Sequence, residues 1–270
     1  MKDLFSLAGR TALVTGGSRG IGRMIAKGFL TQGARVYISA RKAEACEATA
    51  AALTRAGGEC ISLPQDISTL DGCRALAAEI TRREGKLEIL VNNAGAAWAA
   101  EFDEFPEHGW DKVMSLNVKS PFFLTQALHA ALRAAASDSR PAKVINIASI
   151  DGIRLNPLET YSYHASKAAL IYLTKRMAAK LVAEHIVVTA IAPGPFASDM
   201  NRAARDHADV VAARTPLRRI GRDEDMAGAA IYLASRAGDY VVGETHRVRA
   251  ESGQRGPPMQ VHAAAYHFRP

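Results

Sequence analysis

Short apolar runs alternate along this chain with longer amphipathic stretches. Runs that are apolar on both faces and rich in β-branched residues are typical of strands buried in a parallel sheet. Six such runs are present, namely Thr11–Val14, Ala34–Ser39, Cys60–Leu63, Leu87–Val91, Lys143–Ala148 and Ile186–Ile191. Helical periodicity fills the intervals, at Ile21, Ile25 and Phe29 before Gly33 and over Lys42–Ala56, Leu70–Arg83, Trp110–Ala136 and Tyr161–Glu184. This alternation predicts a single-domain α/β fold, a doubly wound parallel sheet with helices on both faces, and does not fit an all-α fold.

Composition mainly excludes classes of protein. With 48% hydrophobic and 23% charged residues, the 270-residue chain is typical of a globular protein. Its net charge of +7 is not gathered into the basic stripe of a nucleic-acid-binding surface, and an anionic cofactor accounts for the basic bias equally well. We expect no membrane span and no secretory signal, because no stretch approaches the roughly 18 apolar residues that a span needs. Cys46, Cys60 and Cys73 neither pair evenly nor follow a metal-ligand spacing, which indicates reduced thiols, a cytoplasmic protein and no metal site.

The first strand runs directly into a glycine-rich loop, TGGSRGIG at Thr15–Gly22, that opens the first helix. In this context the three glycines at Gly16-x-x-x-Gly20-x-Gly22 predict a phosphate cradle of the Rossmann type, with the helix amides facing a pyrophosphate.

The end of the second strand distinguishes between two cofactors. An acidic residue there would bind the free 2′-hydroxyl of NAD, but the chain reads Ser39-Ala40-Arg41-Lys42. Because arginine and lysine attract a 2′-phosphate, and Arg19 could approach the same group, we expect NADP(H) to be preferred, with NAD(H) possible. The alternative is that Arg41 and Lys42 only begin a solvated helix.

Four further polar residues form a candidate catalytic group. Tyr163 and Lys167 are four positions apart in a long helical pattern, so they share one face of that helix. Ser149 follows a strand, at the edge of the sheet where such folds bind ligands. Asn117 lies in the preceding helical stretch.

Six motifs stand in a fixed order: TGGSRGIG, NNAG at Asn92–Gly95, Asn117 within MSLNV, Ser149, YHASK at Tyr163–Lys167, and Pro193-Gly194. In order and approximate spacing they resemble the classical short-chain dehydrogenase/reductase family over about residues 8–245. The stretches FSLAGRTALVTGGSRGIG and ARVYISARKAEAC are similar to those of the 3-oxoacyl (β-ketoacyl) reductases within it. The resemblance implies hydride transfer between NAD(P)(H) and a carbonyl or alcohol substrate.

The resemblance also implies roles for the four polar residues. Tyr163 would act as general acid, with its pKa lowered by the charges of Lys167 and the oxidised nicotinamide. Lys167 would also hold the ribose, Ser149 would polarise the carbonyl, and Asn117 would hold a water molecule in a proton relay to Lys167.

Cofactor-binding residues are implied by position. On the phosphate side they are Gly16, Ser18, Arg19, Gly20, Ile21, Gly22 and Arg41, and on the adenine side Asp66 and Ile67. On the ribose side they are Asn93, Ala94, Gly95, Tyr163 and Lys167, and on the nicotinamide side Ile191, Pro193, Gly194 and Ser198. Ser198 stands where family members often carry threonine.

The carboxyl-terminal end departs from the family pattern. Tyr240–Thr245 starts like the family's last strand, but the usual Asp-Gly-Gly turn is absent and the following residues are basic and rich in glycine and proline. We therefore predict a nucleotide-binding and catalytic domain at residues 1–246 and a mobile tail at 247–270. The two long helical stretches could pair across a dyad, which favours a homodimer or homotetramer.

The leading functional hypothesis is NADPH-dependent reduction of a ketone to a secondary alcohol, with a 3-oxoacyl thioester as one candidate. Trp98, Ile153, Leu155, Phe196 and Met200 are expected to form an apolar wall for the substrate. A secondary-alcohol, sugar or steroid dehydrogenase with the same machinery is one alternative. A catalytically silent NADP-binding sensor is another, and the intact set of Asn117, Ser149, Tyr163 and Lys167 argues against it.

Overall fold

The computed structural model describes residues 3–213 and 215–249. At its centre is one seven-stranded sheet in the order β3-β2-β1-β4-β5-β6-β7, in which all neighbouring strands are parallel. The strands are β1 (Thr11–Thr15), β2 (Arg35–Ser39), β3 (Cys60–Ser62), β4 (Ile89–Asn92), β5 (Ala142–Ile147), β6 (Ile186–Pro193) and β7 (Thr245–Val248). The chain builds outward from β1 to β3 and then returns to place β4 beside β1. The topological switch point, where such sheets bind ligands, therefore lies between β1 and β4.

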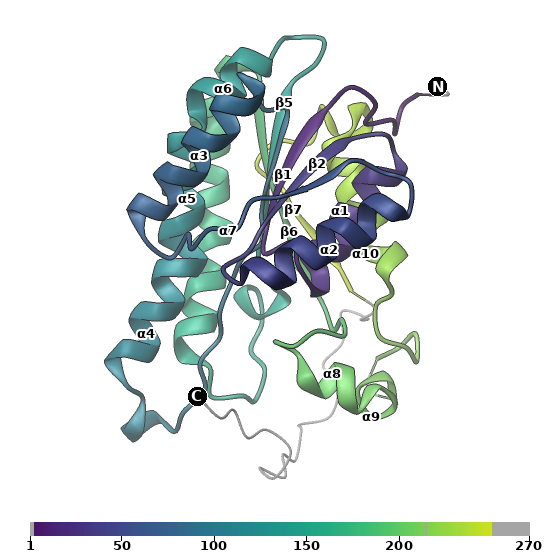
Figure 1. The fold of residues 1–270 in the computed structure, drawn as a ribbon. Coiled ribbons are helices and arrows are strands. Elements are labelled where there is room, and N and C mark those ends of the chain that lie inside the picture. The colour runs from purple at the N-terminus through teal and green to yellow at the C-terminus, as the bar shows by residue number, and fades with distance from the viewer. Residues whose placement is uncertain (1–2, 214, 250–270) are drawn as a thin grey trace.

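Helices cover both faces of the sheet, as Figure 1 shows. On one face are α1 (Gly20–Thr31), α2 (Ala43–Arg55) and α10 (Asp223–Ala234), and on the other are α3 (Leu70–Glu84), α5 (Ser120–Ala127), α6 (His129–Ala135) and α7 (Tyr161–Leu181). α4 (Glu107–Met114) precedes α5, and the short helices α8 (Arg202–Asp206) and α9 (Ala208–Ala213) follow β6 beyond the carboxyl ends of the strands.

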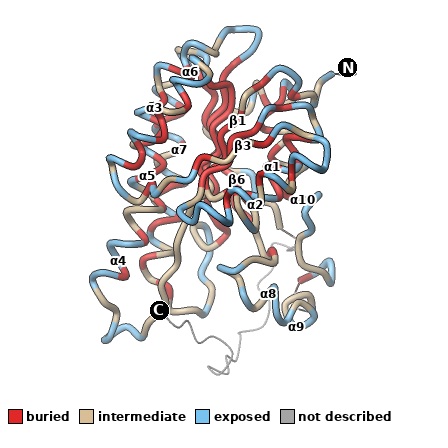
Figure 2. The backbone as a smooth tube through the Cα atoms, viewed as in Figure 1, coloured by how far each residue is buried: buried red, intermediate tan, exposed pale blue. Residues whose placement is uncertain are grey.

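The hydrophobic core lies in two layers, one on each face of the sheet. Because successive side chains of a strand point to opposite faces, Val14 packs with Phe29 of α1 in one cluster, whereas its neighbour Leu13 packs with Leu124 of α5 in the other. Figure 2 shows burial concentrated along the strands and the inner sides of these helices. Within the described ranges, no helix has the length and apolar character needed to cross a membrane.

The structure confirms the predicted fold class and all six predicted strands, with ends shifted by at most two residues. The single helix expected over Trp110–Ala136 is wrong. It is divided into α4, a π-helical turn at Ser115–Lys119, α5 and α6. Pro121 at the start of α5 explains one interruption, because proline lacks an amide hydrogen and cannot donate to the carbonyl of Asn117 four residues earlier. The helix α10 was not predicted.

The last strand also differs from the sequence expectation. Tyr240 is fully exposed, and Gly243 adopts φ +73°, which breaks the extended conformation before pairing begins. β7 therefore starts at Thr245 and pairs with β6 through Val248. Arg247 and Val248 thus belong to the sheet, whereas the tail was predicted to begin at residue 247. Residues 250–270 of that predicted tail lie outside the described residues.

Candidate active site

The glycine loop joins β1 to α1 at the carboxyl edge of the sheet. Gly16 has φ +64°, and a Cβ on Gly22 would lie only 2.4 Å from the carbonyl oxygen of Gly16, so the first turn of α1 packs directly on the loop. α1 begins after Arg19 with no side-chain cap and with no acidic residue in its first turn. No residue of the helix's own first turn neutralises its positive end, so the loop fits a dinucleotide's phosphate groups.

Thr15 locks the glycine loop to the NNAG segment. Its Oγ1 accepts hydrogen bonds from the amides of Asn93 and Ala94, both at 3.0 Å. In return, Asn93 Nδ2 donates to the carbonyls of Thr15 (2.8 Å) and Gly16 (3.2 Å). The Asn93 side chain therefore ties the NNAG segment to the glycine loop. Sequence reasoning gave Thr15 no role, although a hydroxyl at the last position of β1 was a usable signal.

The predicted adenosine side gathers at the ends of β2 and β3. Arg41 is exposed, and its charge acts on Asp66. Burial raises the pKa of Asp66, but two other effects lower it. Ser68 donates its amide to Asp66 Oδ1 at 2.9 Å, and the charge of Arg41 acts in the same sense, so the pKa of Asp66 is below its usual range. Ile67 is buried in the core cluster of its sheet face, so its side chain packs inward.

Tyr163, Ser149 and Lys167 come together where β5 meets the start of α7. Ser149 follows β5, and its Oγ accepts from the amide of Asp151 at 3.1 Å. The Ser149 side chain lies near enough to Tyr163 to act on its hydroxyl and lower the pKa of that phenol. Lys167 Nζ donates to the carbonyl of Ile147 at 2.7 Å and lies 5.6 Å from the centre of the Tyr163 ring. The helical spacing and the strand end predicted from the sequence thus bring these three side chains into one cluster.

Burial dominates the electrostatics of this cluster. It raises the pKa of Tyr163 to about 12, opposed by the Ser149 hydrogen bond and reinforced by Asp151. It lowers the pKa of Lys167 to about 8, while the Asp151 carboxylate acts in the opposite sense. The lowered tyrosine pKa expected from the sequence is therefore not a property of the chain alone, because desolvation outweighs the other effects. Asp151, which influences both groups, had been given no role.

Asn117 is buried on the π-helical turn, and its side chain joins three elements. Oδ1 accepts from the amide of Ala96 at 2.8 Å, and Nδ2 donates to the carbonyl of Ala96 (2.9 Å) and to Ser166 Oγ (3.0 Å). A Cβ on Gly95 would lie 3.2 Å from Asn117 Oδ1 and 3.8 Å from Lys167 Nζ. Asn117 and Gly95 therefore lie beside the Tyr163 cluster, and both Nδ2 donors of Asn117 are already occupied.

The segment after β6 lies beside the glycine loop. Pro193 ends that strand, and the amide of Gly194 donates to the carbonyl of Val248 in β7 at 2.9 Å. Ser198 lies across the amino-terminal end of α1, since a Cβ on Gly20 would be 3.2 Å from the Ser198 Cβ. Arg19, expected at the 2′-phosphate, is ion-paired with Asp199 of this segment.

Only part of the predicted apolar wall has the expected character. Ile153 and Met200 are each 40% exposed, and Leu155 is 88% exposed. Phe196 is instead 3% exposed and packs in the core, where its ring fills the space that a side chain on Gly221 would need. Phe196 is therefore a structural residue, and its assignment to an open substrate wall was wrong.

Fold and site together define an oxidoreductase with a Rossmann-type fold. The family model for short chain dehydrogenases matches residues 10–209. The chain belongs to the short-chain dehydrogenase/reductase family, as the motif order predicted.

Individual relatives extend over nearly the whole chain. The rhamnolipids biosynthesis 3-oxoacyl-(acyl-carrier-protein) reductase of Pseudomonas aeruginosa is 50% identical over 246 residues, covering 90% of this chain and 96% of that protein. The solved RhlG/NADP active-site complex of the same organism superposes with a TM-score of 0.89 at 48% identity, covering 93% of this chain and 98% of that one. Gluconate 5-dehydrogenase of Gluconobacter oxydans is 37% identical, covering 90% of this chain and 94% of that protein. The predicted similarity to 3-oxoacyl reductases is thus confirmed.

Proposed function

We propose that the chain reduces a ketone to a secondary alcohol with NADPH and that the ketone is a 3-oxoacyl thioester. The observation that carries this proposal is the cluster of Tyr163, Ser149 and Lys167 beside the switch point of the sheet. The 50% identity to a 3-oxoacyl-(acyl-carrier-protein) reductase supports the substrate class.

The chemistry of the cluster suits carbonyl reduction. A bound nicotinamide supplies the hydride. As the carbonyl oxygen gains negative charge, the Tyr163 hydroxyl donates its proton and Ser149 Oγ donates a hydrogen bond. A pKa of about 12 keeps Tyr163 protonated at neutral pH, as a proton donor must be. Lys167, protonated below about pH 8, places a positive charge beside the phenol and so favours the phenolate that proton transfer leaves.

The proton that Tyr163 loses must be replaced through Lys167. We assign Asn117 to this path through its backbone carbonyl, because both Nδ2 donors are engaged and Pro121 cannot donate to that carbonyl. In this proposal the carbonyl of Asn117 binds the relay water and its side chain fixes the turn that presents it.

The preference for NADPH over NADH rests on charge at the predicted adenosine side. Arg41 is exposed beside the end of β2, in place of the carboxylate that would accept a 2′-hydroxyl. Together with Arg19 it would bind the 2′-phosphate, and the RhlG/NADP complex supports this choice of cofactor. Ser18, Gly20 and Ile21 belong to the phosphate cradle in the same proposal.

A sugar-type alcohol dehydrogenase is the second candidate, because a gluconate 5-dehydrogenase is 37% identical over a similar length. The two candidates share the Tyr163 cluster and differ in the substrate walls. A panel of 3-oxoacyl thioesters and keto-sugar acids, each offered with NADPH and with NADH, separates them by the ratio of kcat/KM values.

The decisive variant for catalysis is Tyr163→Phe, which removes only the hydroxyl. We expect kcat for the preferred ketone to fall by about 10²–10⁴-fold, measured as loss of the NADPH absorbance band, with NADPH binding retained. Tyr161→Phe is the matched control, because Tyr161 lies two residues away and its hydroxyl donates to Glu159 at 2.7 Å. Equal activity of Tyr163→Phe and the control would exclude Tyr163 as the proton donor. NADPH binding without turnover of any ketone would favour the sensor.

We also propose that two copies pair through α5 and α7. Phe122 on α5 is 37% exposed and Tyr172 on α7 is 75% exposed, so these helices present large apolar side chains outward. Light scattering coupled to size exclusion tests this pairing, and a monomer at micromolar concentration would refute it.

A further inference from the structure

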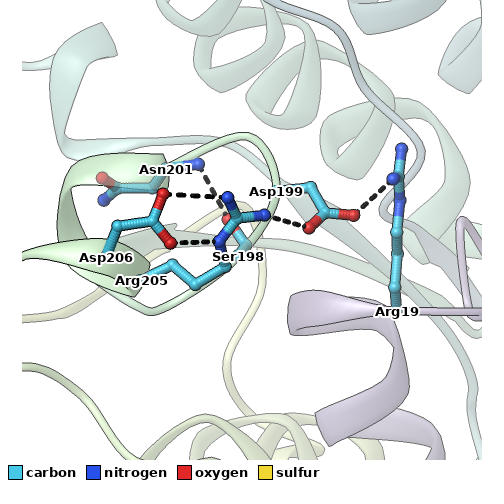
Figure 3. A network of polar contacts seen from close by, with 6 residues as sticks. All are labelled: Arg19, Ser198, Asp199, Asn201, Arg205 and Asp206. Carbon is cyan, nitrogen blue, oxygen red and sulfur yellow. Dashed lines mark hydrogen bonds and ion pairs between the residues drawn. The ribbon is translucent and has the colours of Figure 1, made fainter. Parts of the chain in front are cut away.

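An ion pair joins the glycine loop to the segment that follows β6. Arg19 extends from the loop toward Asp199, and its guanidinium contacts Asp199 Oδ2 (Figure 3). The other carboxylate oxygen of Asp199 accepts from Arg205 Nη1 at 2.7 Å. Asp199 therefore bridges two guanidinium groups, one from each side of the crevice.

The Asp199 side of this bridge is well anchored. Ser198 Oγ accepts from the amide of Asn201 at 3.0 Å, and Asn201 Oδ1 accepts from the amide of Ala204 at the start of α8. Arg205 is held in turn by Asp206, with two hydrogen bonds at 2.6 and 2.9 Å (Figure 3). The segment lies beside the phosphate cradle at Gly20, and the contact of Asp199 with Arg205 does not involve Arg19.

The Arg19 end of the bridge is exposed to solvent. The Arg19 side chain is 71% exposed and that of Asp199 is 46% exposed, so their attraction is screened by water and worth little. Arg205 and Arg19 hold the pKa of Asp199 below its usual range, so this carboxylate is ionised at neutral pH.

We infer that Asp199 is a specificity-determining residue that competes with the cofactor's 2′-phosphate for Arg19 and so weakens the preference for NADPH over NADH. This inference rests on the proposed function, in which Arg19 and Arg41 bind the 2′-phosphate. A 2′-phosphate bound to Arg19 must displace or share the contact between Arg19 and Asp199. NADH lacks this group, so its binding does not depend on freeing Arg19.

The substitution Asp199→Asn tests the inference because it removes the competing charge and keeps the shape of the side chain. Dissociation constants for NADPH and NADH are measured by fluorescence titration of the purified protein. Since an exposed ion pair contributes at most about 1 kcal/mol, we expect NADPH to bind about two- to five-fold more tightly and NADH to be unchanged. The gain for NADPH shrinks as salt is raised, because screening weakens the contact.

Asp206→Asn is the matched control, since Asp206 contacts Arg205 but not Arg19. We expect this variant to leave the ratio of the two dissociation constants unchanged. An equal gain for NADPH and NADH in Asp199→Asn would overturn the inference, as would unchanged or weaker NADPH binding.

Arg19→Ala separates the inference from the proposed function. We expect it to reduce the NADPH preference and to abolish the effect of a second substitution at Asp199. If Arg19→Ala leaves the NADPH preference intact, the assignment of Arg19 to the 2′-phosphate is wrong. If Arg19→Ala reduces the preference but Asp199→Asn does not change it, the cofactor assignment stands and the competition is wrong.

Discussion

The buried ammonium of Lys167 should add to the free energy of unfolding a contribution that rises with pH. Lys167 is 4% exposed, and burial lowers its pKa from the ordinary lysine value of 10.5 to about 8. Between these two values the unfolded chain binds the proton and the folded protein does not. Stability increases with pH wherever the unfolded state binds more protons. Burying the charged Lys167 therefore costs most below about pH 8, and this cost is relieved as the pH rises toward 10.5.

The size of this effect follows from the two pKa values. Between pH 7 and pH 10, a lysine with a pKa of 10.5 unfolded and about 8 folded adds about 2.5 kcal/mol to the free energy of unfolding. For a chain of this length, that amounts to about 5–10 °C in Tm. Tyr163, whose pKa is raised to about 12, opposes the gain above pH 10, because the unfolded phenol then loses its proton first.

Urea unfolding of the wild type and of Lys167→Met at pH 7 and pH 10 isolates the contribution. The difference in unfolding free energy between the two proteins should move by about 2.5 kcal/mol in favour of the wild type on going from pH 7 to pH 10. Lys175→Met, at an exposed position of the same helix, controls for the loss of a lysine as such. Parallel behaviour of the wild type and Lys167→Met across this range would refute the reasoning and remove the electrostatic cost that we assign to the site.

Two other substitutions test buried polar contacts by urea unfolding. Asn117→Ala removes three hydrogen bonds to Ala96 and Ser166, so we expect the free energy of unfolding to fall by about 2–4 kcal/mol. A fall of less than about 1 kcal/mol would show that the side chain does not stabilise the turn. Asp239→Asn removes the ion-pair partner that lies 2.7 Å from the buried ammonium of Lys143. We expect the free energy of unfolding to fall by about 3 kcal/mol, at the low end of the usual range of about 3–5 kcal/mol, because the Asp239 side chain is 30% exposed. Adding Lys143→Met should restore most of that stability, and a double variant no more stable than Asp239→Asn would contradict this explanation.

Much of the architecture could be predicted because its signals are local. Apolar runs such as Ile186–Ile191 specify a buried strand through their β-branched composition, and Gly16–Gly22 specify a tight turn through the backbone freedom of glycine. The cluster of Tyr163 and Lys167 with Ser149 followed from helical spacing and from the rule that ligands bind at the carboxyl ends of parallel strands.

The predictions that failed depended on packing around the residue. Phe196 has the composition of a pocket wall, but the missing side chain of Gly221 gives its ring a place in the core. The last strand was placed too early because Tyr240–Thr245 resembles the start of the family's last strand. In the structure Val241 and Val242 pack onto the two core clusters ahead of the turn at Gly243.

By itself, the sequence determined the alternation of strands with helices, the glycine-rich turn and the candidate polar groups of the site, because each depends on residues within a few positions of one another. Only the tertiary structure decided the direction of the Tyr163 and Lys167 pKa shifts and the pairing of Arg19 with Asp199, 180 positions away. Desolvation and long-range ion pairs depend on what surrounds a group in space, and that is set only when distant segments have packed together.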